Sequence, residues 1–327
     1  MGIPGFVDLQ VNGHLGGDFG DLTLTAESFA RACRELLGKG TAAFLPTIST
    51  SPPEVYEQNL PILADAIESA EFRGRVLGVH LEGPFLSPAP GARGAHNPDW
   101  MRPGDLDVLK HLLDLARGHV RMLTIAPEAE RAEQLARYAA DRGIAVAVGH
   151  TLAGPDDLRR MIDAGATCFT HLGNGLPNLI HRHHNPIWAA LAEDALSITI
   201  ITDGHHLPPE AIKTMVRAKG VERTIVISDA SHLAGMPPGR YSTIDNEVVL
   251  EPSGKLHNPA KQCLVGSSAT MIQCMNHLAS LGLLGLDELS AVGFANPLRL
   301  IGIGPDALAA RGKLSYTAAT GTFSPPA

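Results

Sequence analysis

Residues 78–97, GVHLEGPFLSPAPGARGAHN, begin as a short apolar strand that ends in a single acidic residue, Glu82. A Gly-Pro pair follows at once, and then a loop rich in proline and glycine that carries His96. An unpaired carboxylate at the end of a buried strand is costly, so Glu82 needs a partner. That partner is either a backbone amide in a turn or a metal ion, and this stretch alone does not decide between them.

Two further apolar runs end in a similar way. Residues 143–151, GIAVAVGHT, carry His150 near their end, and residues 166–172, ATCFTHL, carry His171. Three strands therefore each supply one oxygen or nitrogen ligand at the carboxyl end. One glutamate with two histidines suits zinc or ferrous iron, so the sequence predicts a site for one divalent metal ion.

The order of the apolar runs predicts the fold. Eight of them alternate with helical patterns, which is typical of a parallel sheet. We expect strands within residues 5–11, 41–47, 75–82, 119–128, 143–151, 166–172, 196–206 and 223–231. Eight such units predict an α/β fold, a (β/α)8 TIM barrel. An open doubly wound sheet is the alternative, but polar residues end six of the strands, and in a barrel all those ends meet at one mouth.

The remaining segments complete the expected organisation. We predict a single catalytic barrel domain over residues 1–303, with a β-hairpin extension near residues 239–258. Residues 304–327 are expected to form a C-terminal tail, loose from residue 312 onward or a remnant of a β-sandwich.

Composition excludes several classes of protein. The chain has 327 residues with 26 Lys and Arg against 34 Asp and Glu, a net charge of −8, and only 5% aromatic residues. This disfavours a nucleic-acid partner, which needs a basic face. No apolar run reaches the roughly 18 residues of a membrane span, and the N-terminus lacks the pattern of a signal peptide. Four cysteines without C-x-x-C spacing suggest reduced thiols, so we expect a cytoplasmic protein without a membrane partner.

Asp229 ends the last predicted strand, IVISDAS. Beside a metal ion, a carboxylate here can take a proton from water and later return it to a leaving amine, which would hydrolyse an amide. The alternative is an ordinary helix N-cap. Together with the three strand ends that carry metal ligands, the catalytic role is favoured.

Four loop residues are candidates for substrate binding. His96 and His206 could each hydrogen-bond a substrate oxygen, or could order their own loops. Asn174, in HLGNG, offers side-chain and backbone donors. Arg182, in HRHHNP, suits a phosphate or carboxylate group, or is a solvated loop charge.

The separated motifs PGFVDLQVNG, GGDF, VHLEGPF, GAHNPD, VGHT, THLGNGLP, TDGHH, SDA and LVGSSATM occur in this order over residues 4–271. In these motifs the chain resembles the N-acetylglucosamine-6-phosphate deacetylase family of the amidohydrolase superfamily. The resemblance implies metal ligands at Glu82, His150 and His171 and a catalytic acid/base at Asp229. It implies substrate contacts at His96, Asn174 with the adjacent Gly175, Arg182 and His206. It also implies a homodimer, in which Arg182 reaches the phosphate bound by the neighbouring subunit.

The chain departs from the usual family pattern in several places. Many amidohydrolases begin the first strand with H-x-H, which holds a second metal; here these positions are Gln10 and Asn12, so we predict one metal. The family's small β-sandwich is absent or reduced. The loop after the sixth strand reads HRHHNPIWAA in place of the family's usual acidic-proline-glycine stretch, and residues 85–96 form a slightly long loop.

The resemblance and the strand ends together predict a metal-dependent amidohydrolase that removes the N-acetyl group of a small-molecule amino sugar. N-acetylglucosamine 6-phosphate, giving glucosamine 6-phosphate and acetate, is the first candidate, with Zn2+ preferred over Fe2+. A different amide or cyclic amide is the alternative substrate. A third hypothesis, a non-catalytic barrel used for binding, is disfavoured because all three predicted ligands and Asp229 are present.

Overall fold

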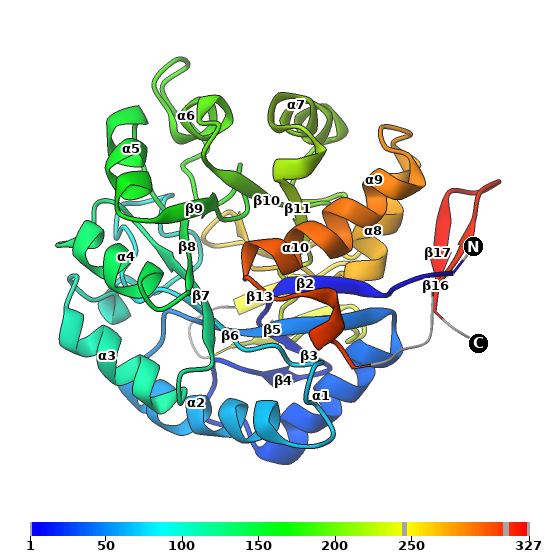
Figure 1. The fold of residues 1–327 in the computed structure, drawn as a ribbon, viewed down its shortest axis with the longest axis horizontal. Helices are drawn as coiled ribbons and strands as arrows, with labels where there is room; N and C mark the ends of the chain where they lie inside the picture. Colours follow the sequence, from blue (N-terminus) through cyan, green and yellow to red (C-terminus); the bar gives the residue numbers. More distant parts are fainter. Residues whose placement is uncertain (1, 244–246, 310–313, 326–327) are drawn as a thin grey trace.

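The computed structural model describes residues 2–243, 247–309 and 314–325. Within these residues, eight parallel strands form one sheet in which each strand pairs with the next one along the chain (Figure 1). They are β2 (Phe6–Val11), β5 (Thr41–Ser49), β6 (Val79–Glu82), β7 (Val120–Ile125), β8 (Ala145–Val148), β9 (Ala166–Phe169), β10 (Ser197–Ile201) and β11 (Thr224–Ile227). The predicted (β/α)8 barrel is confirmed.

The barrel closes between β2 and β11 largely through side chains. The carboxylate of Asp8, within β2, accepts hydrogen bonds from the backbone amide of Ser228 at 3.1 Å and from its hydroxyl group. Further along the seam, Asn12 N donates to Ala230 O at 2.7 Å. These bonds replace a continuous backbone ladder at the seam, so both strands must supply polar groups there.

Helices surround the barrel (Figure 1). They are α1 (Ala26–Gly38), α2 (Pro53–Glu68), α3 (Leu106–Leu115), α4 (Ala132–Ala140), α5 (Pro155–Asp163), α6 (Pro186–Ala192), α7 (Pro209–Lys219), α8 (Met271–Ser280), α9 (Leu286–Ser290) and α10 (Asn296–Leu300). Short 3-10 turns lie at Pro98–Trp100, Val221–Arg223 and Pro305–Ala307, and Ala291–Ala295 is a π-turn. Local sequence explains the ends: the Thr25 hydroxyl, for example, accepts from Ser28 N at the start of α1.

The barrel interior is filled in layers. Towards the amino ends of the strands, apolar side chains such as Leu45 and Met122 pack against Leu298 of α10 and against Ile301, which directly follows this helix. Above them lies a polar layer in which His80 hydrogen-bonds Thr124 Oγ1 at 2.8 Å. The amino end of this interior is filled by apolar side chains, so a functional site is expected at the carboxyl ends of the strands.

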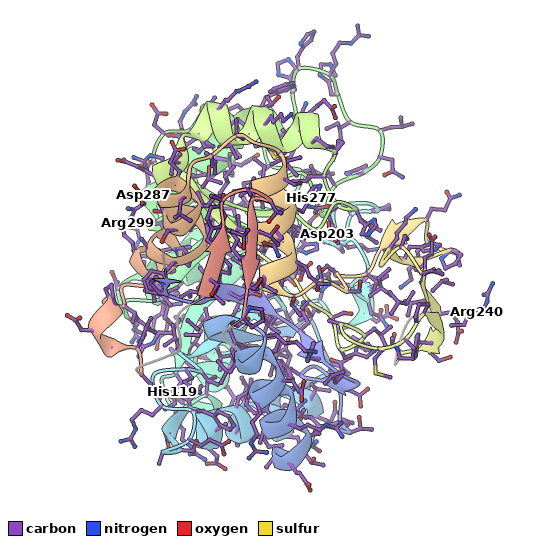
Figure 2. The ribbon with its side chains drawn as sticks, turned by 90° about the vertical axis from the view of Figure 1, so that its right-hand side faces the viewer. His119, Asp203, Arg240, His277, Asp287 and Arg299 are labelled. Atoms are coloured by element: carbon purple, nitrogen blue, oxygen red, sulfur yellow. The ribbon has the colours of Figure 1, made fainter. Side chains whose placement is uncertain are left out.

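Small sheets extend the barrel at its carboxyl end. β12 (Gly239–Ser242), β13 (Glu247–Leu250), β14 (Leu256–Asn258) and β15 (Cys263–Leu264) form one antiparallel sheet. The short strands β3 (Gly13–His14) and β4 (Gly17–Asp18) pair after β2. Figure 2 shows the β12–β15 sheet beyond one end of the barrel, with Arg240 on its outer side. The hairpin expected near residues 239–258 has strands on both sides of its turn. The residues of the turn, 244–246, lie outside the described residues.

The two ends of the chain meet in a further sheet. β16 (Leu314–Thr317) pairs with β1 (Gly2–Ile3) on one side and with β17 (Thr322–Ser324) on the other. Phe323 is buried edge to face against Phe6 of β2, with ring centroids 5.0 Å apart. The tail is therefore not loose over these residues, because Phe323 anchors it to the core. Its description as a sandwich remnant stays a prediction.

In the part of the chain that the structure describes, no helix combines the length and apolar character needed to cross a membrane.

Candidate active site

A cavity of about 1290 Å³ lies at the carboxyl ends of the barrel strands. Its floor contains the strand ends, and its outer wall includes residues of the β12–β15 sheet. All four residues predicted as metal ligands or acid/base line it: Glu82, His150, His171 and Asp229. The predicted strand ends therefore do converge on one cavity.

Glu82, His150 and His171 form one buried cluster whose possible ligand atoms all lie within 4.8 Å of one another. Nε2 of His171 lies 2.9 Å from Glu82 Oε1, and Nε2 of His150 lies 3.4 Å from the same oxygen. The two imidazole Nε2 atoms are 3.1 Å apart. One oxygen and two nitrogens thus point at a common space of the size that a cation needs.

The backbone at three of these strand ends is left-handed. His150 has φ 49°, His171 has φ 31° and Asp229 has φ 49°. Residues other than glycine rarely adopt this conformation, and strain of this kind gathers at functional sites. The left-handed conformation also bends the chain sharply at the end of each strand. The side chain of the residue at the bend therefore lies at the mouth of the barrel, and the residues after it form a loop.

The orientation of His150 is fixed by its surroundings. Its Nδ1 lies 2.9 Å from the carbonyl oxygen of Ala92, to which a protonated Nδ1 donates. A Cβ atom at Gly175 would lie only 2.9 Å from this ring, and one at Gly94 would lie 3.2 Å from it, so glycine is needed at both positions for the loops to approach. With Nδ1 donating, the lone pair of Nε2 faces the cluster, which is the form that binds a metal.

The charges of the cluster also suit a cation. Burial alone would raise the pKa of Glu82, but hydrogen bonds from His150 and His171 hold that pKa well below its ordinary value. Burial would likewise lower the pKa of His171, but the hydrogen bond and charge of Glu82 raise it. The carboxylate of Glu82 is therefore ionised, and its negative charge suits a cation. The three residues fit a divalent metal ion by donor type and by geometry.

Two amides hydrogen-bond Asp229, and one of them also bonds the metal-ligand cluster. Gln10 Nε2 donates to Glu82 Oε1 at 2.8 Å and to Asp229 Oδ1 at 3.0 Å. Asn12 Nδ2 donates to the same Oδ1 at 2.7 Å. Burial, and next the charge of Glu82, raises the pKa of Asp229 to about 6. A carboxylate with such a pKa is ionised at neutral pH and can still hold a proton briefly, as a general acid/base must.

His96 lies immediately beside the metal cluster. Its Nε2 is 3.2 Å from His150 Nε2 and 3.6 Å from Glu82 Oε2. Burial, helped by the charge of His150, lowers the pKa of His96 to about 3, so its ring is neutral at ordinary pH. A neutral imidazole in this position can donate a hydrogen bond to a substrate oxygen.

The other predicted binding residues divide into two groups. Asn174, Gly175 and His206 line the same cavity. Arg182 does not: it is exposed in the loop before α6, and its carbonyl oxygen accepts from Trp188 Nε1 at 3.0 Å. Within one chain, therefore, the structure brings all the predicted site residues together except Arg182.

One residue of the cavity loops was missed by sequence reasoning. Asp203 Oδ2 lies 2.8 Å from His206 Nδ1, and Asp203 Oδ1 accepts the backbone amides of His205 and His206, each at 2.9 Å. Burial would raise the pKa of Asp203, but the hydrogen bond and charge of His206 outweigh it and lower the pKa. An acid three residues before a predicted site histidine, in TDGHH, was the available sign.

Comparison with known proteins gives consistent results. The sequence profile of the amidohydrolase family matches residues 1–238. Human N-acetylglucosamine-6-phosphate deacetylase is 34% identical over 314 residues, which cover 92% of this chain and 74% of that protein. An N-acetylgalactosamine-6-phosphate deacetylase from Shewanella is 33% identical over 300 residues, covering 91% of this chain and 74% of that protein.

A solved structure is similar over almost the whole chain. It is a mutant N-acetyl-D-glucosamine-6-phosphate deacetylase from Mycobacterium smegmatis in complex with N-acetyl-D-glucosamine-6-phosphate. The TM-score is 0.87 at 30% sequence identity, and the match covers 98% of this chain and 84% of that chain.

Proposed function

Because the chain belongs to the amidohydrolase family and is a hydrolytic enzyme, we propose that it removes the acetyl group from N-acetylglucosamine 6-phosphate. The products are glucosamine 6-phosphate and acetate. The observation that carries this proposal is the cluster of Glu82, His150 and His171, joined to Asp229 through one amide inside the cavity. An amide hydrolase needs a site for a metal ion and an acid/base close together, and both are present here.

Glu82, His150 and His171 would hold one divalent cation, for which we propose Zn2+. When bound, this ion polarises the acetyl carbonyl group and lowers the pKa of water to about 7. Gln10 and Asn12 carry amides, which are poor ligands, so we propose one ion per chain. Nε2 of Gln10 is already used by Glu82 and Asp229.

Asp229 is proposed as the group that moves the proton. Its carboxylate accepts a proton from the attacking water, and the same carboxyl group then donates it to the nitrogen of the leaving amine. Both amides bond Oδ1, so Oδ2 is the oxygen that exchanges the proton. His96 and His206 are proposed to bind substrate oxygens, with Asn174 and Gly175 beside them.

We further propose a homodimer in which Arg182, exposed in its own chain, reaches the phosphate group in the neighbouring subunit's cavity. We also propose a cytoplasmic location. A phosphorylated sugar carries charges that a lipid bilayer excludes, so the enzyme must share the compartment in which that sugar is made.

The proposal is tested by measuring acetate release from N-acetylglucosamine and N-acetylgalactosamine, each with and without the 6-phosphate, at defined zinc and iron content. We expect the 6-phosphate of N-acetylglucosamine to react fastest. The galacto sugars are included because one relative is named for the galacto phosphate. Absence of acetate from all four sugars, with hydrolysis of a different amide or cyclic amide, would replace this substrate while keeping the same site.

A further inference from the structure

The two histidines of the metal-ligand cluster are held in different ways. The imidazole of His150 is oriented through its own ring, since its Nδ1 lies 2.9 Å from the carbonyl oxygen of Ala92. Nδ1 of His171 is also buried, but among the described residues it has no hydrogen-bond partner. A histidine that binds a metal usually has its second nitrogen fixed by such a partner. The position of the His171 ring therefore depends more on its backbone than that of His150 does.

The backbone of His171 is fixed from the neighbouring strand by Thr199, within β10. The amide of His171 donates to Thr199 Oγ1 at 2.7 Å, and the next amide, that of Leu172, donates to Thr199 O at 2.9 Å. On the other side, the carbonyl oxygen of His171 accepts from Asn174 N at 2.9 Å. Two consecutive amides beyond the end of β9 thus depend on one fully buried threonine.

A side-chain oxygen is present at this point because the regular pairing of β9 with β10 has stopped. The last paired residues are Phe169 and Ile198, and His171 has a left-handed backbone with φ 31°. Its amide is bonded to a hydroxyl group instead of to a backbone carbonyl. A buried amide without an acceptor is costly, so loss of the hydroxyl would be relieved by movement of the backbone that carries the ligand.

We propose that Thr199 is a positioning residue for metal binding. Its hydroxyl group holds the amide of His171, so that Nε2 of this histidine stays in the cluster with Glu82 and His150. The inference rests on the proposed function, because it takes His171 as a metal ligand. Thr199 is not among the described residues that line the cavity, so it acts through His171 and not by contact with the substrate.

The test compares four side chains at position 199 by their affinity for Zn2+, measured on metal-free protein by competition with a chelator. The unaltered chain and Thr199→Ser carry the hydroxyl group, whereas Thr199→Val and Thr199→Ala lack it. Valine has nearly the volume of threonine, and alanine nearly that of serine. We expect Thr199→Val and Thr199→Ala to bind Zn2+ about 10- to 100-fold more weakly, the range for loss of a group that orients a metal ligand. Thr199→Ser should bind Zn2+ like the unaltered chain.

The matched control is Thr224→Val. Thr224 is the first residue of β11, at the opposite end of the barrel from the cavity. It is as buried as Thr199, and its hydroxyl group donates to Gly220 O at 2.8 Å. Thr224→Val should lower the free energy of unfolding of the metal-free protein, as Thr199→Val does, and leave the affinity for Zn2+ unchanged.

Two results would overturn the positioning role. One is an affinity for Zn2+ that follows side-chain volume, with Thr199→Ser resembling Thr199→Ala. The other is an equal loss of affinity in Thr199→Val and Thr224→Val, which would reflect general stability. Turnover is a separate question: if the unaltered chain binds Zn2+ in a hydroxyl-dependent way but releases no acetate, the proposed reaction fails and the role of Thr199 stands. If the unaltered chain binds no Zn2+, both the metal site and this inference are wrong.

Discussion

Gln10 Nε2 donates a hydrogen bond to Asp229 Oδ1 at 3.0 Å, across the seam where the barrel closes. The same nitrogen donates to Glu82 Oε1 at 2.8 Å. One amide therefore sets the spacing between the proposed metal-ligand carboxylate and the proposed acid/base carboxylate. It also keeps apart two negative charges that would otherwise raise each other's pKa further.

Asp229→Asn should greatly slow turnover and leave the metal in place. Asparagine keeps the shape of the side chain but cannot accept the proton from water, and Asp229 is not one of the three clustered ligands. We expect kcat to fall about 10² to 10⁴-fold, the range for loss of a general acid/base. Elemental analysis checks the metal content of the same sample. A rate near that of the unaltered enzyme would remove Asp229 from the mechanism.

The pH profile should report the same carboxyl group. Without an ion, the pKa of Asp229 is about 6, mainly because of burial. A bound cation favours the ionised form, so in the loaded enzyme the activity should fall as the pH drops through about 6 or below. The protonated carboxyl group cannot act as a base, which gives the sign of the change. Steady-state kcat measured across the acid range tests this, and a rate that rises on acidification would contradict it.

His150→Ala should lose the metal. His150 supplies one of three ligand atoms, and its removal leaves a two-residue site that holds zinc weakly. His119→Ala is the matched control, since His119 lies away from the β12–β15 sheet and pairs with Glu68 at 2.9 Å (Figure 2). Metal content per chain, measured after dialysis, should fall only in the first variant. Full occupancy in His150→Ala would exclude His150 as a ligand.

The strand ends of this fold were predictable from sequence, because a buried parallel strand is an apolar run and the polar residue that ends it lies at the mouth. Glu82, His150, His171 and Asp229 all follow this rule. The partners of these side chains were not predictable. The bond from Gln10 to Asp229 joins residues 219 positions apart and depends on where the barrel closes.

The structure near the C-terminus depends on tertiary contacts. The helical segment that begins with α9 continues through the π-turn and α10 to Leu300. Its continuation depends on Leu298, which packs into the barrel interior and so gains from a contact that local periodicity does not reveal. The position of the β12–β15 sheet over the cavity is also a tertiary property, since its alternating pattern predicts strands but not their neighbours.

Asp203→Asn should weaken substrate binding through His206. Asparagine keeps an acceptor for the two backbone amides but places an amide group against His206 Nδ1, which changes the nitrogen that carries the proton. We expect KM to rise roughly tenfold with a smaller change in kcat. In a double-mutant cycle, Asp203→Asn should add little to His206→Asn, because both changes disrupt one interaction. Asp287→Asn is the control, because Asp287 lies apart from Asp203 (Figure 2). Fully additive effects would show that Asp203 acts elsewhere.

Asp8→Asn should change the pH dependence of stability. Burial, partly offset by hydrogen bonds from Ser228, raises the pKa of Asp8 to about 7. Between about pH 4 and pH 7, the unfolded chain has released this proton while the folded chain keeps it. The free energy of unfolding therefore falls by about 1.4 kcal/mol per pH unit as the pH rises through this range, and levels off above it.

Asparagine is uncharged in both states, so the variant lacks this contribution. Burial lowers the pKa of His80 to about 4 and that of His96 to about 3, which gives the opposite slope, but both histidines are present in both proteins. The difference in free energy of unfolding, unaltered chain minus Asp8→Asn, isolates Asp8. Urea unfolding of metal-free protein at about pH 4 and about pH 8 should show this difference decreasing with pH. A constant difference would mean that Asp8 is ionised in the folded protein, and that the seam between β2 and β11 is closed by a charge.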